Sequence, residues 1–135
     1  MPRTGNQAVA QMRRWNKSGK RGVKGYCLKT CREAYKLPAK YPSAIVAWRR
    51  TPKKYKHKSR LNIPAGALIY YKGGKYGHIV IQSNLKNKVY GTDLPLSDRV
   101  GLHHINLPTR RWGYKYLGWS NWLNGVELKM GGKPE

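Results

Sequence analysis

The chain has 135 residues, which is enough for one domain with a buried core. It carries 28 lysines and arginines against five aspartates and glutamates, a net charge of +23, so catalysis by paired carboxylates has few candidates. A surface this basic attracts polyanions: nucleic acid, anionic lipid or the anionic polymers of bacterial cell walls.

The first half of the chain predicts helices. Three are expected, over residues 6–16, 27–37 and 44–48. The second should begin near Cys27 and end before Pro38, because a helix seldom continues through a proline. Ser43 is a suitable N-cap for the third helix. The basic segment 51–60 is expected to be a loop.

The second half predicts an antiparallel meander. Five strands are expected, over residues 67–71, 78–82, 88–92, 100–105 and 114–119. The glycines in segment 72–77 predict a hairpin between the first two strands. The tail 125–135 is polar and is expected to be frayed. Helices followed by a meander indicate an α+β fold, with one domain over residues 1–135.

Targeting signals are not evident in the sequence. No apolar run approaches the roughly 20 residues of a membrane span. The first residues lack the apolar stretch of a signal peptide, so we expect synthesis in the cytoplasm without such a peptide. The chain has two cysteines, Cys27 and Cys31, and their spacing on one helix disfavours a disulfide, which fits a reducing compartment.

Cys27 is a candidate nucleophile because it opens the second helix. A thiol at a helix N-terminus feels the positive end of the helix dipole. Lys24 and Lys29 add positive charge, and both effects favour the reactive thiolate. The alternative is that Cys27 is a small core residue on an amphipathic helix. Cys31, one turn further along, is expected to face the core.

A cysteine nucleophile needs a base to take its proton and a third group to orient that base. His78 opens the second strand, and Gly77 before it leaves room for close approach. Asp93 ends the third strand and is the expected orienting group, with Thr92 beside it. Each has a plainer alternative, since His78 would serve as a polar strand residue and Asp93 as a turn residue.

The order of these residues resembles the papain-like peptidoglycan cysteine hydrolases of the NlpC and CHAP families. The segments GYCLKTCREAY and GHIVI are similar to their Cys and Gly-His motifs. The segments LPAKYPSAIVAW, VYGTDLP and RRWGYKYLGWSNWLNG resemble a subgroup of such domains in phages of Gram-positive hosts. The likeness covers roughly residues 20–126. It implies a papain-like fold and a lysin that cleaves amide bonds of peptidoglycan at the cell wall without a cofactor.

The resemblance also assigns roles by position. It implies Cys27 as the nucleophile, His78 as the base and Asp93 as the third member, where those families commonly have His, Asn, Gln or Glu. The backbone N–H of Cys27 would bind the oxyanion. Three aromatic residues are expected to line or rim the cleft: Tyr26, Trp112 and Trp122. We expect a monomer whose partners are peptidoglycan and anionic wall polymers, and the bond that it cuts is left open.

Two other functions fit the sequence. Basic segments with interleaved aromatics, such as 49–60, also suit a nucleic-acid or polyanion binding protein without catalysis. A catalytically inactive relative of the hydrolases, used as a structural part, is the other alternative. Zinc is not expected, because Cys27 and Cys31 with the adjacent His103 and His104 make a poor ligand set: neighbouring strand residues face opposite ways.

Overall fold

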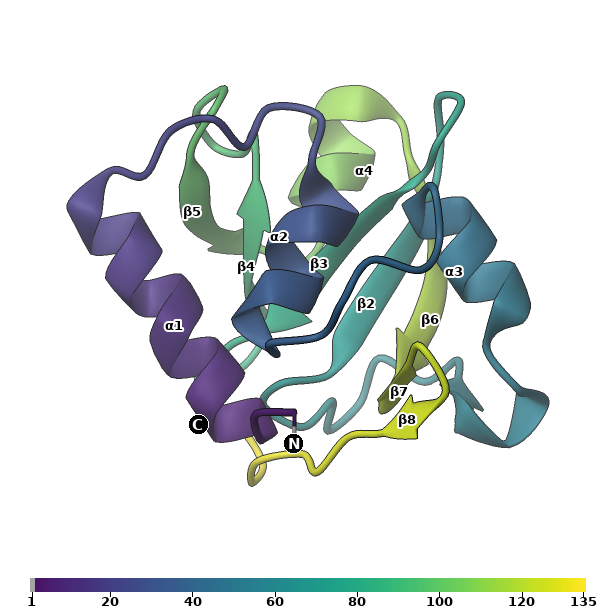
Figure 1. The fold of residues 1–135 in the computed structure, drawn as a ribbon. Helices are drawn as coiled ribbons and strands as arrows, with labels where there is room; N and C mark the ends of the chain where they lie inside the picture. The colour runs from purple at the N-terminus through teal and green to yellow at the C-terminus, as the bar shows by residue number, and fades with distance from the viewer. Residues whose placement is uncertain (1) are drawn as a thin grey trace.

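Three N-terminal helices pack on a six-strand antiparallel sheet in the computed structural model, which describes residues 2–135 (Figure 1). The helices are α1 (Gly5–Ser18), α2 (Cys27–Ala34), α3 (Ala44–Arg50) and α4 (Leu107–Trp112), with a short 3-10 helix η1 at Lys53–Tyr55. The large sheet has the spatial order β1 (Lys56–His57), β6 (Lys115–Ser120), β2 (Leu68–Lys72), β3 (His78–Gln82), β4 (Lys88–Thr92) and β5 (Val100–His104). A second sheet pairs β7 (Trp122–Leu123) with β8 (Val126–Glu127). The expected α+β plan is therefore confirmed.

Local signals explain where the first helices begin. The Thr4 hydroxyl accepts the N–H of Gln7, and the Gln7 side chain accepts the N–H of Thr4, which forms a capping box at the start of α1. The Ser43 hydroxyl accepts the N–H of Val46, so the predicted N-cap of α3 is confirmed. These caps fix where the helices enter the face of the sheet.

The side chains on the two faces of the sheet form two apolar clusters. Successive side chains of a strand point to opposite faces, so Leu68 and Tyr70 pack under the helices whereas Ile69 and Tyr71 point to the other side. The helix-covered cluster also holds Met12 of α1, which is fully buried. Because α2 lies against β3 within this cluster, its first residue is held at the end of the sheet where β3 begins (Figure 1).

The strand count predicted from the sequence is wrong. The meander of β2 to β5 is confirmed, and β6 returns to pair with β2, but β1 adds a sixth strand on the other side of β6. In β1, Lys56 pairs with Ser120 and His57 with Trp119, inside the segment expected to be a loop. Two residues are too few to show an alternating pattern, so only the long-range pairing defines this strand.

The expectation of a frayed C-terminal tail is also wrong. Leu128 is buried, the N–H of Gly131 donates to the carbonyl of Ala65, and that of Glu135 donates to the carbonyl of Asn84. These partners lie far away in the sequence, so the polar composition of the tail gave no sign of them. Among residues 2–135, no helix combines the length and apolar character needed to cross a membrane.

Candidate active site

The packing of α2 on β3 positions Cys27 at the first turn of the helix. Cys31, one turn later, is fully buried, and its thiol donates a hydrogen bond to the carbonyl of Ile79 at 3.7 Å. The expectation that Cys31 faces the core is therefore confirmed. The opposite end of the same helical face carries Cys27, which is partly exposed.

Two carboxylates hold the loop that leads into α2. The carboxylate of Asp98 accepts the N–H groups of Val23 at 2.8 Å and Lys24 at 2.9 Å. The carboxylate of Asp93 accepts the N–H of Gly25 at 3.1 Å and that of Asp98 at 2.8 Å. Backbone hydrogen bonds are the main reason that the pKa of Asp98 lies below its usual value. Together these bonds tie the loop after β4 to the start of α2.

His78 is the first residue of β3 and lies opposite Tyr71 in the register of β2. Gly77 before it has a φ of +71°, and a Cβ at that position would lie 2.9 Å from the carbonyl oxygen of Tyr71. Glycine is therefore required for this close approach. The His78 ring is 96% buried and meets the indole of Trp112 edge-on, with 5.2 Å between ring centroids.

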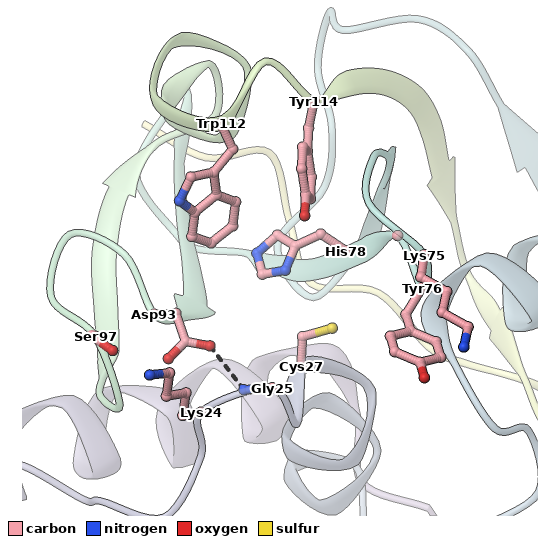
Figure 2. Close-up of a pocket in the computed structure, with 11 residues that line it drawn as sticks. Lys24, Gly25, Cys27, Lys75, Tyr76, His78, Asp93, Ser97, Trp112 and Tyr114 are labelled. Atoms are coloured by element: carbon pink, nitrogen blue, oxygen red, sulfur yellow. Dashed lines mark hydrogen bonds between the residues drawn. The ribbon is translucent and has the colours of Figure 1, made fainter.

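Cys27 and His78 line the same cavity, which has a volume of about 650 Å³ (Figure 2). Its lining residues are Lys24, Gly25, Cys27, Lys75, Tyr76, Gly77, His78, Asp93, Ser97, Trp112 and Tyr114. Figure 2 shows the His78 ring between Trp112 on one side and Cys27 on the other. Three elements distant in the sequence, the start of α2, the start of β3 and the end of α4, thus meet at this cavity.

The three aromatic residues expected at the cleft have different positions. Trp112 lines the cavity with Cys27, whereas the exposed Tyr26 lines an adjoining hollow on the other side of Cys27. Trp122 lies in β7, is buried and stacks on Tyr55 at 6.2 Å. It is not among the residues that line either hollow, because β7 belongs to the second sheet.

Burial sets the protonation states of the two central groups. It raises the pKa of the Cys27 thiol to about 11, although the N–H groups of Ile79 and Leu28 act in the opposite direction. Burial also lowers the pKa of His78 to about 3, and the nearby His103 lowers it further. The raised pKa of Cys27 disfavours the thiolate that the sequence predicts at the helix N-terminus. Loss of hydration outweighs the helix dipole and the lysines.

Asp93 does not contact His78 as an orienting group would. Both of its carboxylate oxygens accept backbone N–H groups, and among the hydrogen bonds of residues 2–135 none joins Asp93 or Cys27 to His78. Asp93 has a φ of +67°, typical of a turn residue. Its contacts match the alternative in which it stabilises a turn, here the one that also holds the start of α2.

His103 on β5 is a site residue that the sequence did not reveal. Its Nδ1 lies 2.9 Å from the carbonyl oxygen of His104, and its Nε2 is buried without a partner. The Nε2 of His78 is likewise buried without a partner. Gly91 on β4 lies between the two strands, and a Cβ there would come 3.5 Å from the Nε2 of His103. The side chain of Val80 occupies the space that a Cβ at Gly91 would need, at 2.6 Å, so glycine is required where His103 and Val80 approach β4.

No metal site is evident in this part of the molecule. Within the described chain, residues 2–135, no three His, Cys, Asp or Glu side chains come close enough to hold a metal ion. Cys27 and His78 line one cavity, but Cys31 is buried in the helix-covered cluster against Ile79, so the cysteine pair and the histidines do not form one ligand set.

Comparison with known proteins identifies no relative. The chain matches no family model, no curated protein and no solved structure. Inference of its function therefore depends on the geometry and chemistry of the cavity.

The raised thiol pKa predicts how Cys27 reacts with iodoacetamide. The alkylation rate should rise about tenfold per pH unit above neutral pH, because only the thiolate reacts and its fraction grows with pH. Mass spectrometry of the alkylated protein measures the rate at Cys27. A Cys31→Ala variant should give the same profile, since Cys31 is fully buried. A rate that is constant from about pH 5 to pH 8 would instead indicate a preformed thiolate–imidazolium pair.

The lowered pKa of His78 predicts sensitivity to acid. The pKa is about 3 in the folded state against 6.5 for an ordinary histidine, so the unfolded chain takes up the proton first. Between these two values, this group should lower the free energy of unfolding by roughly 1.4 kcal/mol for each unit of falling pH. Urea unfolding at several pH values measures the slope. The His78→Gln variant should lack this contribution to the slope. The control Thr92→Val, at a buried residue without a titratable group, should keep it. Equal slopes for wild type and His78→Gln would contradict the assignment.

Proposed function

We propose that this protein is a papain-like cysteine hydrolase that cleaves amide bonds in bacterial peptidoglycan, as a lysin of phage or bacterial origin. The observation that carries the proposal is the meeting of Cys27, the first residue of α2, with His78, the first residue of β3, at one cavity. A nucleophile at a helix start beside a base at a strand start is the arrangement that the resemblance to the NlpC and CHAP families implies.

The reaction begins with both groups neutral. As the sulfur of Cys27 attacks the amide carbon, its proton passes to His78, and the carbonyl oxygen becomes an oxyanion. The N–H of Cys27 at the open end of α2 is in place to stabilise this charge. His78 then gives the proton to the leaving amine, and the C–N bond breaks to leave a thioester. Water, losing a proton to His78, hydrolyses the thioester and releases the acid and the thiol.

The tautomer of His78 follows from His103. A carbonyl oxygen only accepts hydrogen bonds, so the Nδ1 of His103 must carry the proton that is donated to the His104 carbonyl. The Nε2 of neutral His103 is then an acceptor, suited to the Nε2–H of His78. This leaves the Nδ1 of His78 unprotonated and available as the base. We therefore propose that His103, in place of Asp93, orients His78 once the two Nε2 atoms, which are both without a partner in this structure, form this hydrogen bond.

The charge of the chain suits a cell-wall substrate. Wall polymers such as teichoic acids are polyanions, and a net charge of +23 would concentrate the protein on them. The same charge would also bind nucleic acid. It therefore supports binding to a polyanionic cell wall but gives no support for amide-bond cleavage. The cavity with its thiol and imidazole supports the chemistry.

A catalytically inactive relative is the second candidate. The observation that favours it is the neutral resting pair, with a thiol pKa of about 11 and no hydrogen bond between Cys27 and His78 among residues 2–135. An active enzyme must lower the barrier to proton transfer when the substrate displaces water from the cavity. Release of peptidoglycan fragments by the purified protein distinguishes the two candidates.

Replacement of Cys27 tests the proposed nucleophile. Cys27→Ala should lower fragment release by more than about 10⁴-fold, as expected when a covalent nucleophile is removed. Mass spectrometry of digested peptidoglycan measures the release and also identifies the bond that is cut. Circular dichroism should show an unchanged fold. Lys58→Ala, at an exposed lysine outside the cavity, is the control and should retain activity. Equal activity of wild type and Cys27→Ala would refute the assignment.

Replacement of His103 tests the proposed orienting group. His103→Ala should lower kcat by roughly 10²-fold with little change in KM, because the base would lose its fixed tautomer and not its substrate. His103→Gln should restore part of kcat, since its amide oxygen can accept the Nε2–H of His78. Steady-state kinetics on a soluble muropeptide measures both constants. The control is His57→Ala, which replaces a histidine on β1 and should leave kcat unchanged. If His103 has only a structural role, the His103→Ala and His103→Gln variants should have equal kcat at comparable stability.

A further inference from the structure

A second hollow adjoins the cavity at Cys27. It has a volume of about 460 Å³ and shares Gly25, Cys27 and Tyr76 with the cavity that contains His78. Its lining residues are Gly25, Tyr26, Cys27, Leu28, Lys29, Arg32, Ala39, Tyr41, Pro42, Ser43, Ala44 and Tyr76. The two hollows therefore form one groove, and the thiol of Cys27 lies where they join.

The position of His78 gives this groove a direction. His78 lines the first cavity only, so the amine to which it returns a proton must leave on that side of Cys27. The second hollow then receives the acyl part of the substrate, the part that forms the thioester. We call it the acyl-side hollow.

Charge distinguishes the two sides of the groove. In the first cavity, the acid Asp93 accompanies Lys24 and Lys75. In the acyl-side hollow, the charged lining residues are Lys29 and Arg32, without an acid. A further shallow hollow shares Tyr41 and Pro42 with it and adds Lys40 and Arg50, again without an acid. The acyl side is therefore uniformly cationic.

Tyrosine rings form much of the wall of the acyl-side hollow, and Lys29 in this hollow and Lys40 beside it each lie over one of these rings. Tyr26 is 54% exposed and Tyr76 is 59% exposed, which is high for rings of this size. The ammonium group of Lys29 lies 5.3 Å from the ring centroid of Tyr26, and that of Lys40 lies 5.7 Å from that of Tyr41. A ligand segment that enters between these rings meets fixed positive charge.

Arg32 adds a directed donor. One of its guanidinium nitrogens donates to the carbonyl of Leu37 at 3.3 Å, which fixes the side chain beside the hollow. A guanidinium held in this way presents further N–H groups in the planar fork that matches a carboxylate. Tyrosine walls, the apolar side chains of Leu28 and Ala44, and a carboxylate-binding fork together suit an acidic peptide.

We propose that the acyl-side hollow binds a peptide segment that bears a free carboxylate, held by Lys29 and Arg32 between the tyrosine rings. The inference rests on the proposed hydrolase function, because the direction of the groove follows from the role of His78. For a peptidoglycan substrate, it selects stem peptides whose glutamyl α-carboxylate is free over those in which this group is amidated.

Binding to an uncleaving variant tests this selectivity apart from catalysis. The full-length Cys27→Ala protein is titrated by calorimetry with two synthetic stem peptides that differ only in a free or an amidated glutamyl carboxylate. The free acid should bind about tenfold or more tightly, as expected for hydrogen bonds to a charged group. Adding Lys29→Met together with Arg32→Met should reduce this preference to near unity. Adding Lys58→Met, at an exposed lysine outside the groove, should keep it.

Several outcomes would overturn the inference. Equal affinity for the two peptides excludes recognition of the carboxylate. A preference that survives replacement of both Lys29 and Arg32 by Met excludes this hollow as the binding site. A poly(glycerol phosphate) chain that binds more tightly than the free-acid peptide, and that depends on Lys29, assigns the hollow to a phosphodiester polymer. If wild type releases no peptidoglycan fragments while the carboxylate preference persists, the hydrolase function fails and the binding site stands.

Discussion

The buried contact between α2 and β3 is the constraint on which the site depends. Cys31 is fully buried at this contact, and its thiol bonds to the carbonyl of Ile79, the residue that follows His78. This anchors the helix one turn below Cys27 and the strand one residue beyond the imidazole. The thiol and the ring are thereby brought to one cavity at the end of the sheet. The loop before α2 is fixed from the other side by Asp93 and Asp98.

The burial of Cys27 and His78 at the cavity also shifts their pKa values. Both the thiol and the imidazole lose hydration, and each is driven toward its neutral form, as the raised pKa of Cys27 and the lowered pKa of His78 indicate. In the proposed hydrolase, proton transfer from this neutral pair would wait until a substrate occupies the cavity. The backbone carbonyl of His104 accepts from the Nδ1 of His103 and so fixes the tautomer of His103, the group that we propose to orient His78.

Because acidic residues are scarce, aromatic rings serve as contact partners for several of the cationic side chains. With five acidic residues against 28 basic ones, most cations cannot find a carboxylate partner. Several lie over tyrosine or tryptophan rings instead, among them Lys29 over Tyr26 and Lys56 over Trp48. Such contacts hold a cation in position without neutralising it. A groove built in this way keeps its positive charge available to an anionic ligand.

The sequence by itself determined the features that depend on local patterns. The helix that begins at Cys27, the hairpin before His78 and the cap at Ser43 follow from apolar spacing, glycines and capping residues, and the structure confirms them. The tertiary structure alone decided what depends on register and burial. It brought His103 on β5 close to Gly91 on β4, because the register between strands depends on long-range pairing that no local sequence pattern shows. It also raised the pKa of the Cys27 thiol, because the loss of hydration that opposes the helix dipole exists only once the chain has packed around the sulfur.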